Sequence, residues 1–149
     1  MLETNRTKNE SNNPDDIVAE NHRALAEIIL GNPAVYQSLF DNSEDVTLGN
    51  PFGPFARGWQ NVADTLVGAA SHYRDGEVTD IALVSKHITD TIAVYVETES
   101  ARAKLDGGSD FVSFSLRVTS VFQLRKNGWK LIHRHADPIM SARGVEALT

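Results

Sequence analysis

The sequence predicts an α+β domain in which three N-terminal helices cover one face of a curved antiparallel β-sheet. Apolar residues recur at helical spacing in three segments before Gly76. After Gly76 the spacing becomes twofold, in segments rich in Val, Ile, Thr and aromatic residues. Helices that precede strands in this order are typical of domains whose helices pack on a single face of the sheet.

The three helices are expected between residue 13 and Gly76. Asn13-Pro14-Asp15-Asp16 offers a capping residue, a proline and two acids, which suit a helix N-terminus. Its apolar face comprises Ile17, Asn21, Ala24, Leu25, Ile28 and Ile29, and Gly31 can end it. Asn32-Pro33 begins a short helix through Phe40. A third helix follows Gly58 and ends at Gly76, with a stripe of Trp59, Val62, Ala63, Leu66, Ala70 and Tyr73.

The strands form an antiparallel meander. A short strand is expected at Val46-Thr47-Leu48, and longer ones near residues 77–87, 90–105, 110–126 and 129–139. Asp106-Gly107-Gly108-Ser109 and Asn127-Gly128 are turn sequences, and the second is the strongest hairpin signal. Without a repeat or second domain, we expect a disordered tail over residues 1–13, one domain over 14–140 and a C-terminal tail over 141–149.

Composition excludes several classes of function. The chain has 149 residues, a formal charge of −6 and no cysteine. The negative charge argues against nucleic-acid or membrane partners, and the lack of cysteine excludes disulfides, thiol nucleophiles and Cys-ligated metals. No apolar run approaches the roughly 18 residues of a membrane span, and no signal-peptide core is present, so a soluble cytoplasmic protein is expected.

The last hairpin carries the candidate site. If Asn127-Gly128 forms a two-residue turn, Ser120 pairs with His135, and the face that includes Leu124 and Leu131 is buried. Four polar residues share that face: Ser120, His133, His135 and Asp137. Burying unpaired polar groups costs about 1–3 kcal/mol each, so this cluster implies mutual hydrogen bonds, water or a ligand pocket.

Two of these residues can form an acid–base pair. Side chains at i and i+2 on a strand lie about 7 Å apart, so Asp137 can orient the imidazole of His135 and raise its basicity. We therefore predict His135 and Asp137 as catalytic; the alternative is that the histidines satisfy backbone groups at the sheet end. His133-x-His135-x-Asp137 also has the form of a metal triad, but further ligands are not evident and no metal site is predicted.

Other candidates surround this hairpin. Glu97, on the preceding strand with Glu99, either reaches the pocket or marks a solvated face. The stiff aromatic segment 50–55 places Phe52 and Phe55 near Trp59, as an apolar lip over the cavity or as a core plug. The remaining histidines are predicted to be exposed to solvent: His22, His72 and His87.

Several stretches carry a resemblance to a known family. They are Ser38-Leu39-Phe40 leading to Asp45-Val46-Thr47, Asn50-Pro51-Phe52-Gly53 with Gly58, Leu116-Arg117-Val118-Thr119, and the run from Gly128 to Pro138. From about Asp15 to Ile139 the chain resembles the nuclear transport factor 2-like superfamily, and within it the SnoaL-like branch. The resemblance implies a cystatin-like cone of helices on a strongly bent sheet, a cavity at the wide end and frequent homodimers.

The resemblance extends to ketosteroid isomerases, polyketide cyclases, dehydratases and epoxide hydrolases. The isomerase base would fall on Asn50, its oxyanion tyrosine on Ala24 and its protonated aspartate on Ser120. An amide has no basic lone pair for removing a carbon-bound proton, so Asn50 cannot act as the isomerase base. The other two isomerase groups are replaced as well. The resemblance also places His133, together with His135 and Asp137, in the cavity, and it leaves Asn50 and Ser120 to position a substrate by hydrogen bonds.

The expected function is acid–base catalysis of the isomerase, cyclase, dehydratase or hydrolase type on a small polar carbonyl or epoxide compound. The alternatives are a non-catalytic small-molecule binding module and a dimerisation domain. The expected partners are a small-molecule ligand and a second copy packed on the outer sheet face, where Arg117 and Thr119 point. Nucleic acid, membrane and cofactors are not expected.

Overall fold

The computed structural model describes residues 13–149. The predicted N-terminal tail, residues 1–13, therefore lies outside the described residues except for Asn13. The helices are α2 (Asp15–Ile28), α3 (Ala34–Leu39) and α4 (Trp59–Ala70), and the short 3-10 helix η1 spans Val145–Leu148. The strands are β1 (Thr47–Gly49), β2 (Ala56–Arg57), β3 (Tyr73–Ile88), β4 (Ile92–Leu105), β5 (Phe111–Arg125) and β6 (Gly128–Asp137).

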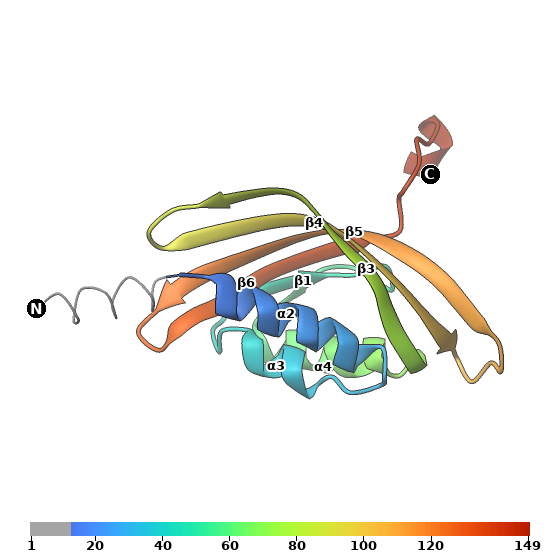
Figure 1. The fold of residues 1–149 in the computed structure, drawn as a ribbon, viewed down its shortest axis with the longest axis horizontal. Coiled ribbons are helices and arrows are strands. Elements are labelled where there is room, and N and C mark those ends of the chain that lie inside the picture. The colour runs from blue at the N-terminus through green and yellow to red at the C-terminus, as the bar shows by residue number, and fades with distance from the viewer. Residues whose placement is uncertain (1–12) are drawn as a thin grey trace, which may run out of the picture.

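One mixed sheet forms the body of the molecule. Its strand order is β2-β1-β6-β5-β4-β3, in which β1 and β6 are parallel and all other neighbours are antiparallel. Figure 1 shows the sheet arching over the three helices, which all lie on its concave side. The predicted α+β class, with helices on one face of a curved sheet, is confirmed.

The two Asn-Pro sequences begin helices as predicted. The side-chain Oδ1 of Asn13 accepts a hydrogen bond from the Asp15 amide at 2.9 Å, and that of Asn32 accepts one from the Ala34 amide at 3.1 Å. Each bond satisfies an amide that has no partner within its helix. These asparagines fix where α2 and α3 start and so where their apolar faces meet the sheet.

The third helix ends earlier than predicted. α4 stops at Ala70, and Tyr73 already begins β3. The amide of Gly76 donates to the carbonyl of Ile29, and the amide of Asp106 donates to the carbonyl of His72. These long-range hydrogen bonds draw the segment after Ala70 into the sheet although its apolar spacing continues the helix pattern.

The last hairpin differs from the predicted register in two ways. Its two-residue turn is Lys126-Asn127, and Gly128, with a φ of 102°, pairs with Arg125. A bulge at Ile132 then separates the Phe122–Leu131 pair from the Val121–His133 pair. An extra residue in one strand of a pair reverses the facing of every residue beyond it.

The core lies between the helices and the concave face of the sheet. Alternate residues of β4 point into it, from Ala93 and Tyr95 through Glu97 and Glu99 to Ala101 and Ala103. Large apolar side chains from the helices and from β5 and β6 complete it: Leu25, Ile29, Leu66, Phe122 and Leu131. Two carboxylates therefore stand in the middle of an apolar layer, and the site is built around the partners that they require.

Among the described residues, no helix is long and apolar enough to cross a membrane.

Candidate functional site

A small cavity lies between the helix layer and the concave face of the sheet. Its volume is about 40 Å³, which is room for very few water-sized groups. Most of its wall is apolar and comes from α2 and its C-terminal end, from α4, and from strands β1, β5 and β6: Leu25, Ile28, Ile29, Leu48, Leu66, Ala69, Phe114, Leu116 and Ala136. We call this space the inner cavity.

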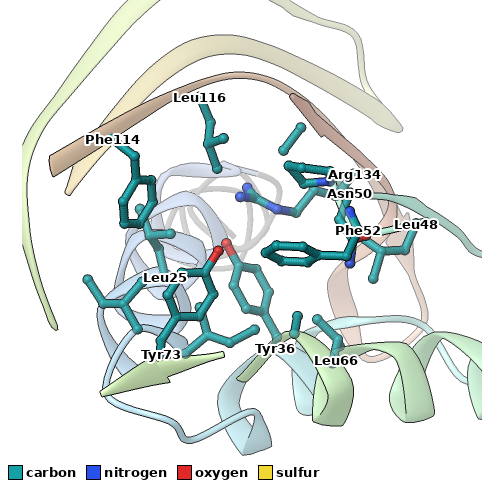
Figure 2. A pocket seen from close by; sticks show the side chains of 15 residues that line it. Leu25, Tyr36, Leu48, Asn50, Phe52, Leu66, Tyr73, Phe114, Leu116 and Arg134 are labelled. Carbon is teal, nitrogen blue, oxygen red and sulfur yellow. Dashed lines mark hydrogen bonds between the residues drawn. The ribbon is translucent and has the colours of Figure 1, made fainter. Parts of the chain in front are cut away.

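Besides Asn50, three polar side chains line the inner cavity, and they come from different elements. Tyr36 comes from α3, Tyr73 from the start of β3 and Arg134 from β6. Figure 2 shows both phenol hydroxyls and the guanidinium directed toward the middle of the cavity. The Tyr36 hydroxyl is buried and makes no hydrogen bond with any other described residue. A buried donor without a partner costs free energy, so this hydroxyl is available to a bound molecule.

Both phenols stay protonated at neutral pH. Burial raises the pKa of Tyr36 and of Tyr73 because the phenolate would lose its hydration, and the nearby positive charge of Arg134 offsets only part of this. Each hydroxyl is therefore a hydrogen-bond donor. The Tyr73 ring stacks on Phe114 at 5.7 Å between centroids, which fixes the direction of its hydroxyl.

Arg134 is held by the second buried carboxylate. Its two terminal nitrogens donate to Glu99 at 3.0 and 2.8 Å, and the relative exposures of the two residues are 6% and 2%. Burial by itself would lower the pKa of Arg134, but the attraction of Glu99 outweighs it and the pKa is raised. The guanidinium lies 5.2 Å from the centre of the Tyr36 ring. A permanent positive charge thus forms one wall of the inner cavity.

A second space lies outside the first. It has a volume of about 270 Å³ and shares five lining residues with the inner cavity: Pro51, Phe52, Tyr73, Phe114 and Leu116. His72, Leu105, Asp106 and Pro138 complete it. We call it the outer chamber. Phe52 borders both spaces, is 49% exposed and packs its ring 4.6 Å from that of His72.

His72 and Asp106 form a close pair at the rim of the outer chamber. His72 follows α4, and Asp106 begins the turn between β4 and β5 with a φ of 49°. The imidazole Nδ1 lies 2.6 Å from Asp106 Oδ1, and the Asp106 amide donates to the His72 carbonyl at 3.0 Å. A carboxylate only accepts hydrogen bonds, so Nδ1 carries the proton and Nε2 is left as the basic nitrogen.

Glu97 is buried, so it does not mark a solvated face. It does not line the inner cavity either, because it binds His22 instead. His22 Nε2 donates to both Glu97 oxygens, at 2.9 and 3.2 Å. This hydrogen bond raises the pKa of His22 although burial opposes the shift. The expectation that His22 and His72 are simply solvated is wrong, because each is only partly exposed and holds a carboxylate.

The predicted inward orientation of the last strand's polar residues is wrong. Beyond the bulge at Ile132, Arg134 and Ala136 face the core, while His133, His135 and Asp137 face the convex side of the sheet. The apolar alternation around the hairpin turn gave the correct face up to Leu131, and the bulge reversed it after that. Ser120 does face inward, fully buried, but its hydroxyl has no partner among the described residues.

Two of these displaced residues, His135 and Asp137, line a groove of about 290 Å³ on the convex face, together with Arg117 and Thr119. Asp137 accepts a hydrogen bond from Arg117 at 2.7 Å, which lowers the pKa of Asp137, whereas its oxygen lies 3.9 Å from His135 Nε2. Asp137 is therefore bound to Arg117 first. His133 Nδ1 lies 2.7 Å from the Thr47 hydroxyl. The catalytic role of His135 stays a prediction. Because His135 lies on the convex face, this role applies only to a molecule bound in the convex groove.

The aromatic segment divides between the two faces. Asn50 and Phe52 line the inner cavity, and Asn50 Oδ1 accepts the Phe52 amide. Phe55 instead packs 5.4 Å from the His135 ring on the convex side, and Trp59 donates its indole N–H to the Gln37 carbonyl within the helix layer. Of the three aromatics considered for a lip, only Phe52 borders the inner cavity.

The sequence did not predict the site roles of Tyr36, Tyr73, Arg134 or the His72–Asp106 pair. One signal was available for Arg134: two carboxylates two residues apart on a strand with buried neighbours require cationic partners. Nothing in the sequence links His72 to Asp106 across 34 positions. Within residues 13–149, no three His, Asp or Glu side chains gather as a metal site requires.

Comparison with known proteins agrees with this architecture. A family model described as a SnoaL-like domain matches residues 17–141. No curated protein sequence matches the chain. Among solved structures, a nuclear transport factor 2-like superfamily protein from Salmonella enterica superposes with a TM-score of 0.72 at 21% identity, over 88% of this chain and 93% of that one.

Two further solved structures carry names that refer to an activity. A proposed dehydratase of the nuclear transport factor 2-like family from Streptomyces avermitilis gives a TM-score of 0.65 at 24% identity, over 87% of this chain and all of that one (100%). A ketosteroid isomerase-like protein from Erwinia carotovora gives 0.64 at 12% identity, over 84% and 95% of the two chains. At these identities the similarity establishes the fold.

Proposed function

The chain belongs to the SnoaL-like domain family, and from that premise we propose that it performs acid–base catalysis on a small compound bearing a carbonyl or epoxide oxygen. The inner cavity receives this oxygen. The rest of the compound occupies the outer chamber, after Phe52 moves aside. The proposal replaces the convex-face histidines with residues on the concave face as the groups that meet the substrate.

The observation that carries the proposal is the unpartnered Tyr36 hydroxyl, which points with Tyr73 and Arg134 into an apolar space. Two neutral donors beside a fixed positive charge are suited to an oxygen that gains negative charge during a reaction. The surrounding apolar wall excludes water and so strengthens each of these interactions. Isomerisation, dehydration and epoxide opening all develop charge on such an oxygen, and proteins of similar fold carry names from the first two classes.

The test compares two tyrosines that differ in position alone. Cyclohexanone in heavy water reports exchange of its α-protons, and cyclohexene oxide reports hydrolysis. We expect wild-type protein to accelerate at least one of these reactions, and Tyr36→Phe to lower kcat on the order of 10²-fold, as loss of an oxyanion donor does. Tyr95→Phe is the matched control, because its hydroxyl is also buried and unpartnered but lies outside the inner cavity.

Both variants should fold, since each removes a hydroxyl that makes no hydrogen bond with a described residue. Equal rates for Tyr36→Phe and wild type would contradict the proposed role of the inner cavity. Failure of wild-type protein to accelerate either reaction would contradict the proposed catalysis.

Binding without turnover is the second candidate, and one observation favours it. The residues that line the inner cavity include no Asp, Glu or His, and burial keeps its two tyrosines protonated, so none of them is in a basic form at neutral pH. This candidate predicts that small ketones raise the Tm and are recovered unchanged.

A further inference from the structure

We propose that His72 is the general base of this site and that Asp106 is its positioning residue. The inference rests on the proposed function, because it supplies the base that the inner cavity lacks. The ligand class is a compound with a carbonyl group and at least one hydrogen on the adjacent carbon.

The geometry places the base and the oxygen donors at two ends of one space. Tyr73 lines both the inner cavity and the outer chamber, and His72 lines the outer chamber. When the oxygen of a ligand accepts a hydrogen bond from Tyr73, the carbon atoms of that ligand extend into the outer chamber, which His72 lines. The Phe52 ring, 4.6 Å from the His72 ring and 6.2 Å from the Tyr73 ring, borders the path between them.

Asp106 fixes His72 by two bonds that do not depend on a ligand. Its carboxylate holds Nδ1–H at 2.6 Å, and its backbone amide holds the His72 carbonyl at 3.0 Å. The side-chain bond selects the tautomer with a free Nε2 lone pair, and the carboxylate stabilises the imidazolium that forms when Nε2 takes a proton. This is the arrangement that a general base requires.

The other two histidine–carboxylate pairs of the described chain do not offer this arrangement. His22 uses Nε2 to hold Glu97, and neither residue lines the inner cavity or the outer chamber. His135 lies on the convex face, where its carboxylate partner is 3.9 Å away and is bound by an arginine. Only the pair at the chamber rim combines a free basic nitrogen with access to the cavity.

The reaction step needs no co-reactant. His72 Nε2 removes the proton from the carbon next to the carbonyl, and the electrons of that C–H bond form a carbon–carbon double bond. The carbonyl π electrons move to the oxygen, where hydrogen bonds from Tyr36 and Tyr73 stabilise the charge. The imidazolium then returns its proton to carbon, at the same or another position, and neutral His72 is restored.

The experiment measures exchange of the α-protons of butanone, cyclohexanone and acetophenone in heavy water by proton NMR. We expect His72→Ala to lower the exchange rate by on the order of 10² to 10⁴-fold with unchanged ketone affinity, and added imidazole to restore part of it. A structural role would not respond to imidazole. His87→Ala is the control, since His87 is an exposed histidine remote from both spaces.

A second measurement needs no ligand. Nitrogen-15 NMR should show neutral His72 with its proton on Nδ1, and Asp106→Asn should shift the proton toward Nε2 and slow exchange at least tenfold. Asparagine tolerates the left-handed backbone of position 106, so this variant should fold. A wild-type proton on Nε2 would overturn the inference.

The outcomes separate the two proposals. If wild-type protein accelerates exchange and Tyr36→Phe slows it while His72→Ala does not, the inference is overturned and the proposed function stands. If wild-type protein accelerates exchange of none of the three ketones, the inference is overturned; the proposed function is overturned as well if hydrolysis of cyclohexene oxide is not accelerated either.

Discussion

At the scale of single residues, the site depends on how two buried carboxylates of β4 are neutralised. Glu99 holds Arg134 through two hydrogen bonds, and Glu97 holds His22. Removing two charges from water costs several kcal/mol per ion, so a buried pair is retained only where its geometry is good. Arg134 cannot lose its charge, whereas His22 can. The first pair therefore gives the cavity a constant positive wall, and the second makes stability depend on pH.

The His22–Glu97 pair predicts a pH-dependent contribution to stability. The pKa of His22 in the folded state lies above the ordinary value of 6.5, so the folded protein binds the His22 proton more tightly than the unfolded chain does. The contribution is complete below about pH 6.5 and is lost as the pH rises through the raised pKa. We expect the difference in unfolding free energy between wild type and His22→Gln, from urea titrations, to shrink between pH 6 and pH 9.

Glutamine can still donate a hydrogen bond to Glu97 but does not titrate, so the comparison isolates the proton. His87→Gln provides the background for removing an exposed histidine. A difference between wild type and His22→Gln that stays constant or grows over this pH range would refute the assignment.

At the scale of elements, the bulge at Ile132 decides which side chains of β6 form the site. Without it, the alternation that buries Leu131 would also bury His133 and His135. With it, Arg134 takes the inward position opposite Ser120 and reaches Glu99. Periodicity in the sequence correctly identified β6 as a strand and its first half as core. It did not reveal the bulge, because no residue type specifies one by itself and the inward position of Arg134 is stabilised by a partner on β4.

The close approach of β3 to the end of α2 predicts that a side chain at Gly76 lowers the free energy of unfolding. A Cβ at Gly76 would lie 2.5 Å from the Ile29 carbonyl oxygen and 2.8 Å from the Ile29 Cβ, so Gly76→Ala must push β3 away from α2. We expect a loss of about 1–3 kcal/mol in unfolding free energy, as for other overpacked sites. Calorimetry or urea denaturation checks this prediction.

Gly68→Ala is its matched control. Gly68 lies in α4, is exposed, and a Cβ there meets no atom within 4 Å. Alanine is the better helix former, so this variant should gain up to about 1 kcal/mol. The close approach of β3 to α2 would be refuted if Gly76→Ala were as stable as Gly68→Ala.

At the scale of the whole molecule, the concave sheet and the helix layer enclose the inner cavity between them, as Figure 1 shows for the two layers. The sequence predicted this architecture well, because helical and twofold apolar spacing depend on local chain geometry. It did not predict the composition of the cavity. Tyr36, Tyr73 and Arg134 come from α3, β3 and β6, and only the packing of these elements brings them together.

The central claim is that a small oxygen-bearing compound binds inside the concave face and not on the convex one. Methyl NMR during a titration with cyclohexanone tests this directly. We expect shifts at the methyl groups of Leu25, Leu48 and Leu66, which line the inner cavity, and unchanged signals at Val96 and Thr119 in the convex groove. Shifts confined to Val96 and Thr119 would contradict it.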